Sequence, residues 1–92
     1  MAADDFDELM GRVRGVLIAL GGALTSGEAA EVDELLDHAE LGEALRTLAW
    51  LIVEEHKQIA SADIDEIRAL AERMGIANEL PQILHEHGVD DA

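Results

Sequence analysis

Apolar residues recur every three or four positions along most of this chain, which is the spacing of one face of an α-helix. No run of alternating β-branched residues is long enough to indicate a strand. The pattern predicts four helices and a short fifth one, over about residues 4–23, 26–39, 41–57, 63–75 and 79–87.

Helix ends are indicated by capping residues. Thr25 with Glu28, and Asp63 with Glu66, have the spacing of a capping box, which would start the second and fourth helices. Gly75 predicts a left-handed C-terminal cap for the fourth helix. Four amphipathic helices with short connections predict an all-α fold: a compact antiparallel four-helix bundle with the short fifth helix packed across one end.

The chain of 92 residues supports a single domain, 1–92, in which we expect residues 1–3 and 89–92 to be frayed. The second half of the first helix, residues 15–24, is apolar on every side. Such a segment is either a central core helix or a surface that another chain covers, and a homodimer through residues 15–24 is one form of the second alternative.

Helical spacing separates inward from outward positions. The second helix should bury Val32, Leu35, Leu36 and Ala39. The inward sector of the third helix contains Leu41, Ala44, Leu45, Leu48, Ile52 and Glu55. Its opposite face contains Glu43, Arg46, Trp50, Glu54 and Lys57, so the largest apolar side chain of the protein should lie among charges.

The composition is strongly acidic. Twenty-one acids against six bases give a formal net charge of −15, although 49% of the residues are hydrophobic, so the chain should fold. Such a charge repels nucleic acid and anionic membranes and favours a basic protein partner. The chain has no Cys, no basic N-terminal export signal and no apolar run long enough to span a membrane, which together predict a cytoplasmic protein.

The stretch from Glu28 to Glu40 contains six acids and no Lys or Arg. It is either an ordinary solvated helix face or a binding face. The absence of basic residues at helical i,i+4 spacing within the stretch favours binding, because a helix selected only for stability would intersperse them.

Catalytic chemistry finds little support in the sequence. His85 and His87 would point about 200° apart on a helix, and neither they nor the run from Glu54 to His56 has the spacing of a zinc-hydrolase helix. No nucleophile triad or glycine-rich phosphate loop is present. We therefore expect neither an enzyme nor a metal or other cofactor.

The segment 31–75 resembles the MafI-type immunity proteins of bacterial polymorphic toxin systems, in the order and spacing of its residues. The matching residues are Leu35, Leu36, Asp37, His38, Ala39, Glu40, Gly42, Ala44, Leu45, Leu48, Glu54, Ile59, Ser61, Met74 and Gly75. The match covers roughly half of the chain. Two departures are Ala39, where such proteins often have Gly, and Trp50, where a polar residue is more usual.

The resemblance implies a cytoplasmic protein that binds and blocks one cognate toxin, commonly a nuclease. An acidic inhibitor would approach a basic toxin quickly and could occupy its substrate groove. From the residues and the resemblance together we expect a partner-binding surface on the outer faces of the second and third helices. Its residues are Asp33, Asp37, His38, Glu40, Glu43, Trp50 and Glu54. The alternative is a small acidic helical oligomerisation or structural module without a toxin partner.

Overall fold

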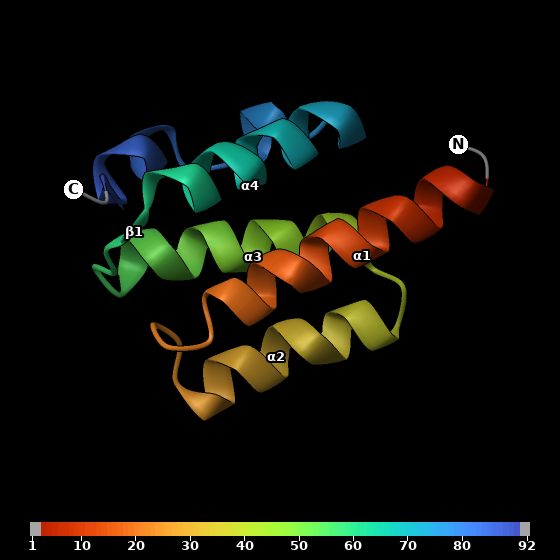
Figure 1. Ribbon diagram of the computed structural model, residues 1–92, viewed down its shortest axis with the longest axis horizontal. Helices are drawn as coiled ribbons and strands as arrows, with labels where there is room; N and C mark the ends of the chain where they lie inside the picture. Colours follow the sequence, from red (N-terminus) through yellow and green to blue (C-terminus); the bar gives the residue numbers. More distant parts are fainter. Residues whose placement is uncertain (1–2, 91–92) are drawn as a thin grey trace.

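The four main helices are α1 (Ala3–Ala19), α2 (Ser26–Asp37), α3 (Leu41–Glu54) and α4 (Ser61–Met74) in a computed structural model that describes residues 3–90. Successive helices run in opposite directions (Figure 1), and α3 packs against each of the other three helices while α1 also packs directly against α4. The predicted all-α helical bundle is confirmed. Expectations for residues 1, 2, 91 and 92 lie outside the described residues.

The predicted fifth helix is instead two 3₁₀ helices, η1 (Ala77–Glu79) and η2 (Gln82–His87). Leu80, between them, is extended with φ −84° and ψ 154°. It precedes Pro81, and the proline ring disfavours the α conformation in the residue before it. The continuous helix over 79–87 was therefore wrong, and η2 packs against α3 and α4.

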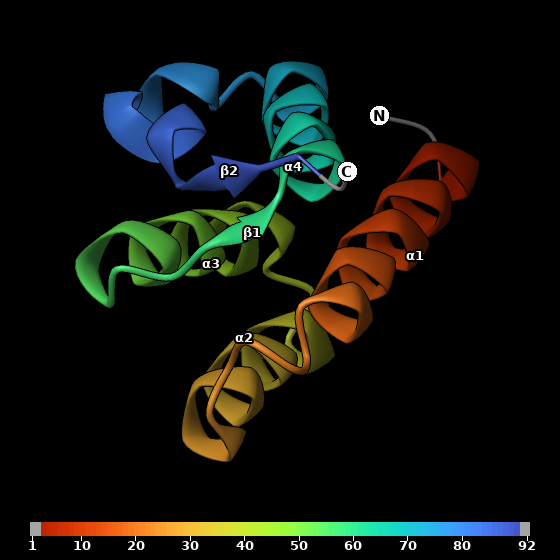
Figure 2. The same cartoon turned by 60° about the vertical axis from the view of Figure 1, so that its left-hand side comes forward.

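Two short strands, which the sequence pattern did not predict, bring distant segments together. Ile59–Ala60 (β1) pairs in parallel with Gly88–Val89 (β2), in the register Ile59 to Gly88 and Ala60 to Val89 (Figure 2). A Cβ on Gly88 would lie 3.1 Å from Ser61 Oγ, so glycine suits this close approach. Val89 is thus paired, in contrast to the frayed end that we expected.

The capping predictions have mixed outcomes. The Thr25–Glu28 capping box is present, with Glu28 N donating to Thr25 Oγ1 at 3.1 Å and Thr25 N to Glu28 Oε1 at 2.9 Å. The Asp63–Glu66 box was wrong, because α4 begins at Ser61 and its N-cap residue makes no side-chain cap hydrogen bond.

Three helices end on a left-handed residue: Ala39 (φ 60°), His56 (φ 52°) and Gly75 (φ 74°). After each, the next amide donates to the carbonyl five residues earlier at 2.9 Å, which is the hydrogen bond of a Schellman motif. Gly75 confirms the predicted cap. The other two motifs end α2 and α3 before the predicted ends, so Ala39 and Glu55, both expected to face inward, are exposed.

The core lies between all four helices and contains no buried polar or charged residue among those described. The central helix α3 contributes its whole predicted apolar face. Its buried residues are Leu41, Ala44, Leu45, Leu48, Ala49 and Ile52. In α2, Val32 and Leu36 are buried as predicted, and Leu35 is half-buried.

The second half of α1 is part core and part surface. Val16, Leu17 and Leu20 are buried, whereas Ile18 is 75% exposed and Gly15 is exposed as well. The helix itself ends at Ala19, four residues before the predicted end. The segment therefore matches neither predicted alternative in full: one side is buried in the core and the other side is exposed.

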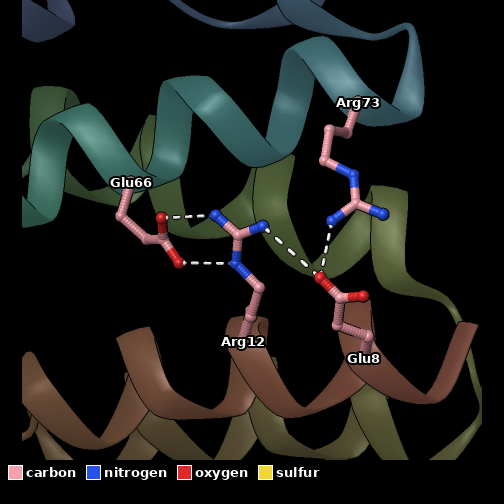
Figure 3. A network of polar contacts seen from close by, with 4 residues as sticks. All are labelled: Glu8, Arg12, Glu66 and Arg73. Atoms are coloured by element: carbon pink, nitrogen blue, oxygen red, sulfur yellow. Dashed lines mark hydrogen bonds and ion pairs between the residues drawn. The ribbon is translucent and has the colours of Figure 1, made fainter. Parts of the chain in front are cut away.

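Ion pairs join α1 to α4 across the bundle (Figure 3). The Arg12 guanidinium donates two hydrogen bonds to the Glu66 carboxylate, from Nε at 2.9 Å and Nη2 at 2.7 Å. Arg73 donates to Glu8 at 2.9 Å, and Arg12 lies 3.9 Å from the same Glu8 carboxylate. Hydrogen bonding to Arg12 lowers the pKa of Glu66, so the pair is ionised at neutral pH.

None of the helices in the described part of the chain combines the length and apolarity needed to cross a membrane.

Candidate protein-binding site

A shallow groove of about 340 Å³ lies on the outer face of α2 and α3. Most of its lining comes from one face of α3, where the residues follow each other at helical spacing, and Glu31 contributes from α2. The lining residues are Glu31, Glu43, Arg46, Thr47, Trp50, Leu51 and Glu54. The groove therefore contains three of the predicted partner-binding residues: Glu43, Trp50 and Glu54.

Trp50 lies at the surface among charged residues, as the helical spacing predicted, and is 44% exposed. Its Nε1 donates a hydrogen bond to the main-chain oxygen of Glu79 at 3.3 Å, which ties α3 to η1. The indole N–H is therefore already used within the protein. What Trp50 offers to a partner is the carbon surface of its ring.

The one base in the groove is held by two carboxylates. Arg46 Nη2 lies 2.6 Å from Glu43 Oε1, and Nη1 lies 2.6 Å from Glu79 Oε1. These bonds, the one to Glu43 first, raise the pKa of Arg46. Glu31 and Glu54 make no ion pair with any other described residue, so the groove has a net negative charge around Trp50.

Asp33 and Asp37, also predicted to bind a partner, lie on the other side of α2, toward α1. Arg14 Nη1 is 2.7 Å from Asp33 Oδ1, and its Nη2 is 3.5 Å from Asp37 Oδ1. The structure thus divides the predicted site between two sides of α2. Both aspartates are partly neutralised by a base from α1.

Glu28 also has a basic partner from outside the acidic stretch. Lys57 Nζ lies 2.9 Å from Glu28 Oε1, and the two side chains are only 12% and 16% exposed. The Thr25 amide and then Lys57 lower the pKa of Glu28. The acidic stretch from Glu28 to Glu40 is therefore not the unpaired face that its sequence suggested, because tertiary contacts supply cations that the stretch lacks.

His38 and Glu40 lie in the turn between α2 and α3 and are exposed. The His38 amide donates to Glu34 O at 3.1 Å, and Glu40 is the N-cap residue of α3 without a side-chain cap hydrogen bond. Neither lines the groove. The structure therefore shows both residues as part of the turn between α2 and α3 and does not bring them together with the groove residues.

Glu31 is the groove residue that sequence reasoning omitted. A signal was available, since Glu31 precedes the half-buried Leu35 by one helical turn and so lies at the margin of the α2 core stripe. The residue on α3 that it faces could not be identified without the packing of the two helices.

A second hollow of about 570 Å³ lies between α4 and the 3₁₀ segments and was not predicted. Arg68, Glu72 and His85 are its charged or titratable lining residues. His85 Nδ1 lies 3.1 Å from Gln82 O. Within residues 3–90, no three His, Cys, Asp or Glu side chains are grouped so as to hold a metal ion.

No family model matches the sequence, and no significant similarity to a curated protein or to a solved structure was found.

Proposed function

We propose that this protein is an immunity protein that binds and neutralises a cognate bacterial toxin domain in the cytoplasm, using the groove between α2 and α3. The observation that supports this proposal is the half-exposed Trp50 surrounded by Glu31, Glu43 and Glu54. Tryptophan side chains are enriched among the residues that dominate binding energy, and acidic neighbours select a basic partner. The residue pattern shared with MafI-type immunity proteins supports the toxin as that partner.

The net charge supports a rapid encounter with a basic toxin. A formal charge of −15 attracts a cationic surface over a distance set by the ionic strength. A nuclease toxin has a basic surface for its own substrate, and an acidic inhibitor that occupies this surface would block catalysis. The mechanism needs no catalytic group in the inhibitor.

The test first asks whether a secreted protein with a basic C-terminal domain is encoded beside this protein, and then uses that domain as the toxin. Association and dissociation rates are measured by stopped flow at several salt concentrations, and cell growth is scored when the toxin is expressed with or without this protein. We expect protection of growth and an association rate that falls steeply with salt while dissociation changes little. An association rate that is independent of salt would contradict the proposal that the acidic surface attracts the toxin.

Trp50→Ala tests the groove itself. It should weaken toxin binding by roughly 2 kcal/mol or more. Because the variant also loses the Trp50–Glu79 hydrogen bond and the covered part of the ring, its Tm should fall as well, and binding is measured well below that Tm. Glu34→Gln is the matched surface control, since Glu34 is exposed on α2 and does not line the groove. Equal effects of the two variants on toxin binding would remove the groove from the proposal.

A second candidate function is self-association, and one observation favours it: Ile18 is 75% exposed on the apolar end of α1. Two copies could cover this residue together with the exposed Gly15 and Ala19. Sedimentation of the protein and of Ile18→Glu would decide it, with Ile83→Glu as the control because Ile83 is 48% exposed on η2. A monomer at all concentrations would exclude this candidate.

A further inference from the structure

The groove on α2 and α3 presents one aromatic ring and two acids that lack an ion-pair partner among the described residues. The indole N–H of Trp50 is used by Glu79 O, and Arg46 is held by Glu43 and Glu79. What remains available to a ligand is the ring surface of Trp50 and the carboxylates of Glu31 and Glu54.

We propose, building on the function proposed above, that this groove takes an arginine side chain of a basic protein segment, stacked on Trp50 and hydrogen-bonded by Glu31 and Glu54. A cation over an indole ring is attracted by the negative ring face. The same cation donates charge-assisted hydrogen bonds to carboxylates beside the ring. Ring and acids therefore select the same ligand.

Arginine fits this combination better than lysine does. Its guanidinium is planar, so it can stack on the indole while its donors point outward in the plane toward the acids. The lysine ammonium is more strongly hydrated and has no flat face. An apolar side chain is a poor ligand here, because it would bury carboxylates without giving them hydrogen bonds.

Because the chain contains a single Trp, its intrinsic fluorescence reports on Trp50 alone. The probe is a peptide of alternating Gly and Arg with uncharged ends, titrated into the full chain at low salt and compared with the matching Gly–Lys peptide. We expect a saturable change in Trp50 fluorescence with the arginine peptide and weaker binding of the lysine peptide, by roughly two- to fivefold for the lost stacking contribution.

Charge variants separate the groove from general attraction to an acidic protein. Glu31→Gln with Glu54→Gln should weaken the arginine peptide by roughly two- to tenfold, whereas Glu34→Gln, with one charge removed outside the groove, should have little effect. Trp50→Leu keeps an apolar side chain but loses the aromatic ring, and calorimetry should show a similar loss of affinity. Circular dichroism checks that each variant remains folded.

Equal binding of the two peptides, an equal effect of Glu34→Gln and of the double variant Glu31→Gln with Glu54→Gln, or no fluorescence change on binding would each overturn the arginine site. None of these outcomes involves a toxin, so they leave capture of a cognate toxin by this face as a separate question. Conversely, loss of toxin protection with retained peptide selectivity would reject the immunity function and leave the arginine site standing.

Discussion

Ala39 holds a backbone conformation that glycine adopts more readily. Its φ of 60° places it in the left-handed region, at the C-terminal end of α2. Its side chain is exposed, so Ala39→Gly removes a methyl group that contributes little to the core. The variant therefore isolates the conformational cost of the left-handed residue.

The expected gain follows from two opposing free energies. A left-handed conformation costs a residue with a Cβ roughly 1–2 kcal/mol relative to glycine. Glycine gives the unfolded chain more freedom, which costs about 0.4–1 kcal/mol on folding. The net stabilisation of Ala39→Gly is then about 0–1.6 kcal/mol, centred near 0.8 kcal/mol, and for a domain of this size the central value should raise the Tm by roughly 3–6 °C.

Two control variants test the sign of this effect. Ala69→Gly changes the same residue type at an exposed position inside α4, where glycine should destabilise by about 1 kcal/mol. Gly75→Ala introduces a Cβ at φ 74°, where nothing lies within 4 Å, so its expected destabilisation is conformational rather than steric. Thermal melts followed by circular dichroism measure all three. If Ala39→Gly destabilises the protein as Ala69→Gly does, the left-handed conformation at residue 39 is wrong.

Three further predictions concern the ion pairs and the core. Glu28→Gln should lower stability at neutral pH, because the lowered pKa of Glu28 stabilises the fold at every pH above its unfolded pKa. This contribution is lost as pH falls through the folded pKa, so urea melts of the two proteins should converge at still lower pH. A stability difference unchanged from neutral to acid pH would contradict the Glu28–Lys57 pair. A double-mutant cycle with Arg12→Ala and Glu66→Ala should show a favourable coupling that decreases with added salt, and additive effects would argue against the α1–α4 bridge. Leu48→Ala, at a fully buried position of α3, should destabilise by about 2–5 kcal/mol in urea unfolding, and a loss under 1 kcal/mol would place Leu48 outside the core.

The helices could be predicted from sequence because their apolar faces are regular, and the α3 face shows this most clearly: five of its apolar positions, from Leu41 to Ile52, were predicted to be buried and are. Helix ends were less predictable. Ala39 and His56 end α2 and α3 in a conformation for which their side chains give no signal, whereas Gly75 does. The paired strands are two residues long, too short for an alternating pattern to show.

The candidate site could be predicted only where it lies on one helix. Glu43, Trp50 and Glu54 share a face of α3, and helical spacing alone brought them together. Asp33 and Asp37 were grouped with them because they face outward on α2. In the structure they form ion pairs with Arg14 of α1 instead. Which acids are neutralised depends on tertiary packing, and no local pattern contains that information.

The net charge by itself does not locate a binding site. Six bases cannot neutralise twenty-one acids, so fifteen negative charges would remain under any pairing of this composition. Arg12 and Arg14 join one helix to another, and Lys57 joins the connection after α3 to α2, which relieves repulsion where these elements meet and leaves the outer faces negative. Most of that outer charge is distributed and acts on a partner through its long-range field, which governs the association rate. Among residues 3–90, only the groove combines negative charge with an exposed aromatic ring, a short-range contact that governs dissociation. Removing charge at Glu34 should therefore slow association slightly and leave dissociation unchanged, whereas loss of Trp50 should accelerate dissociation.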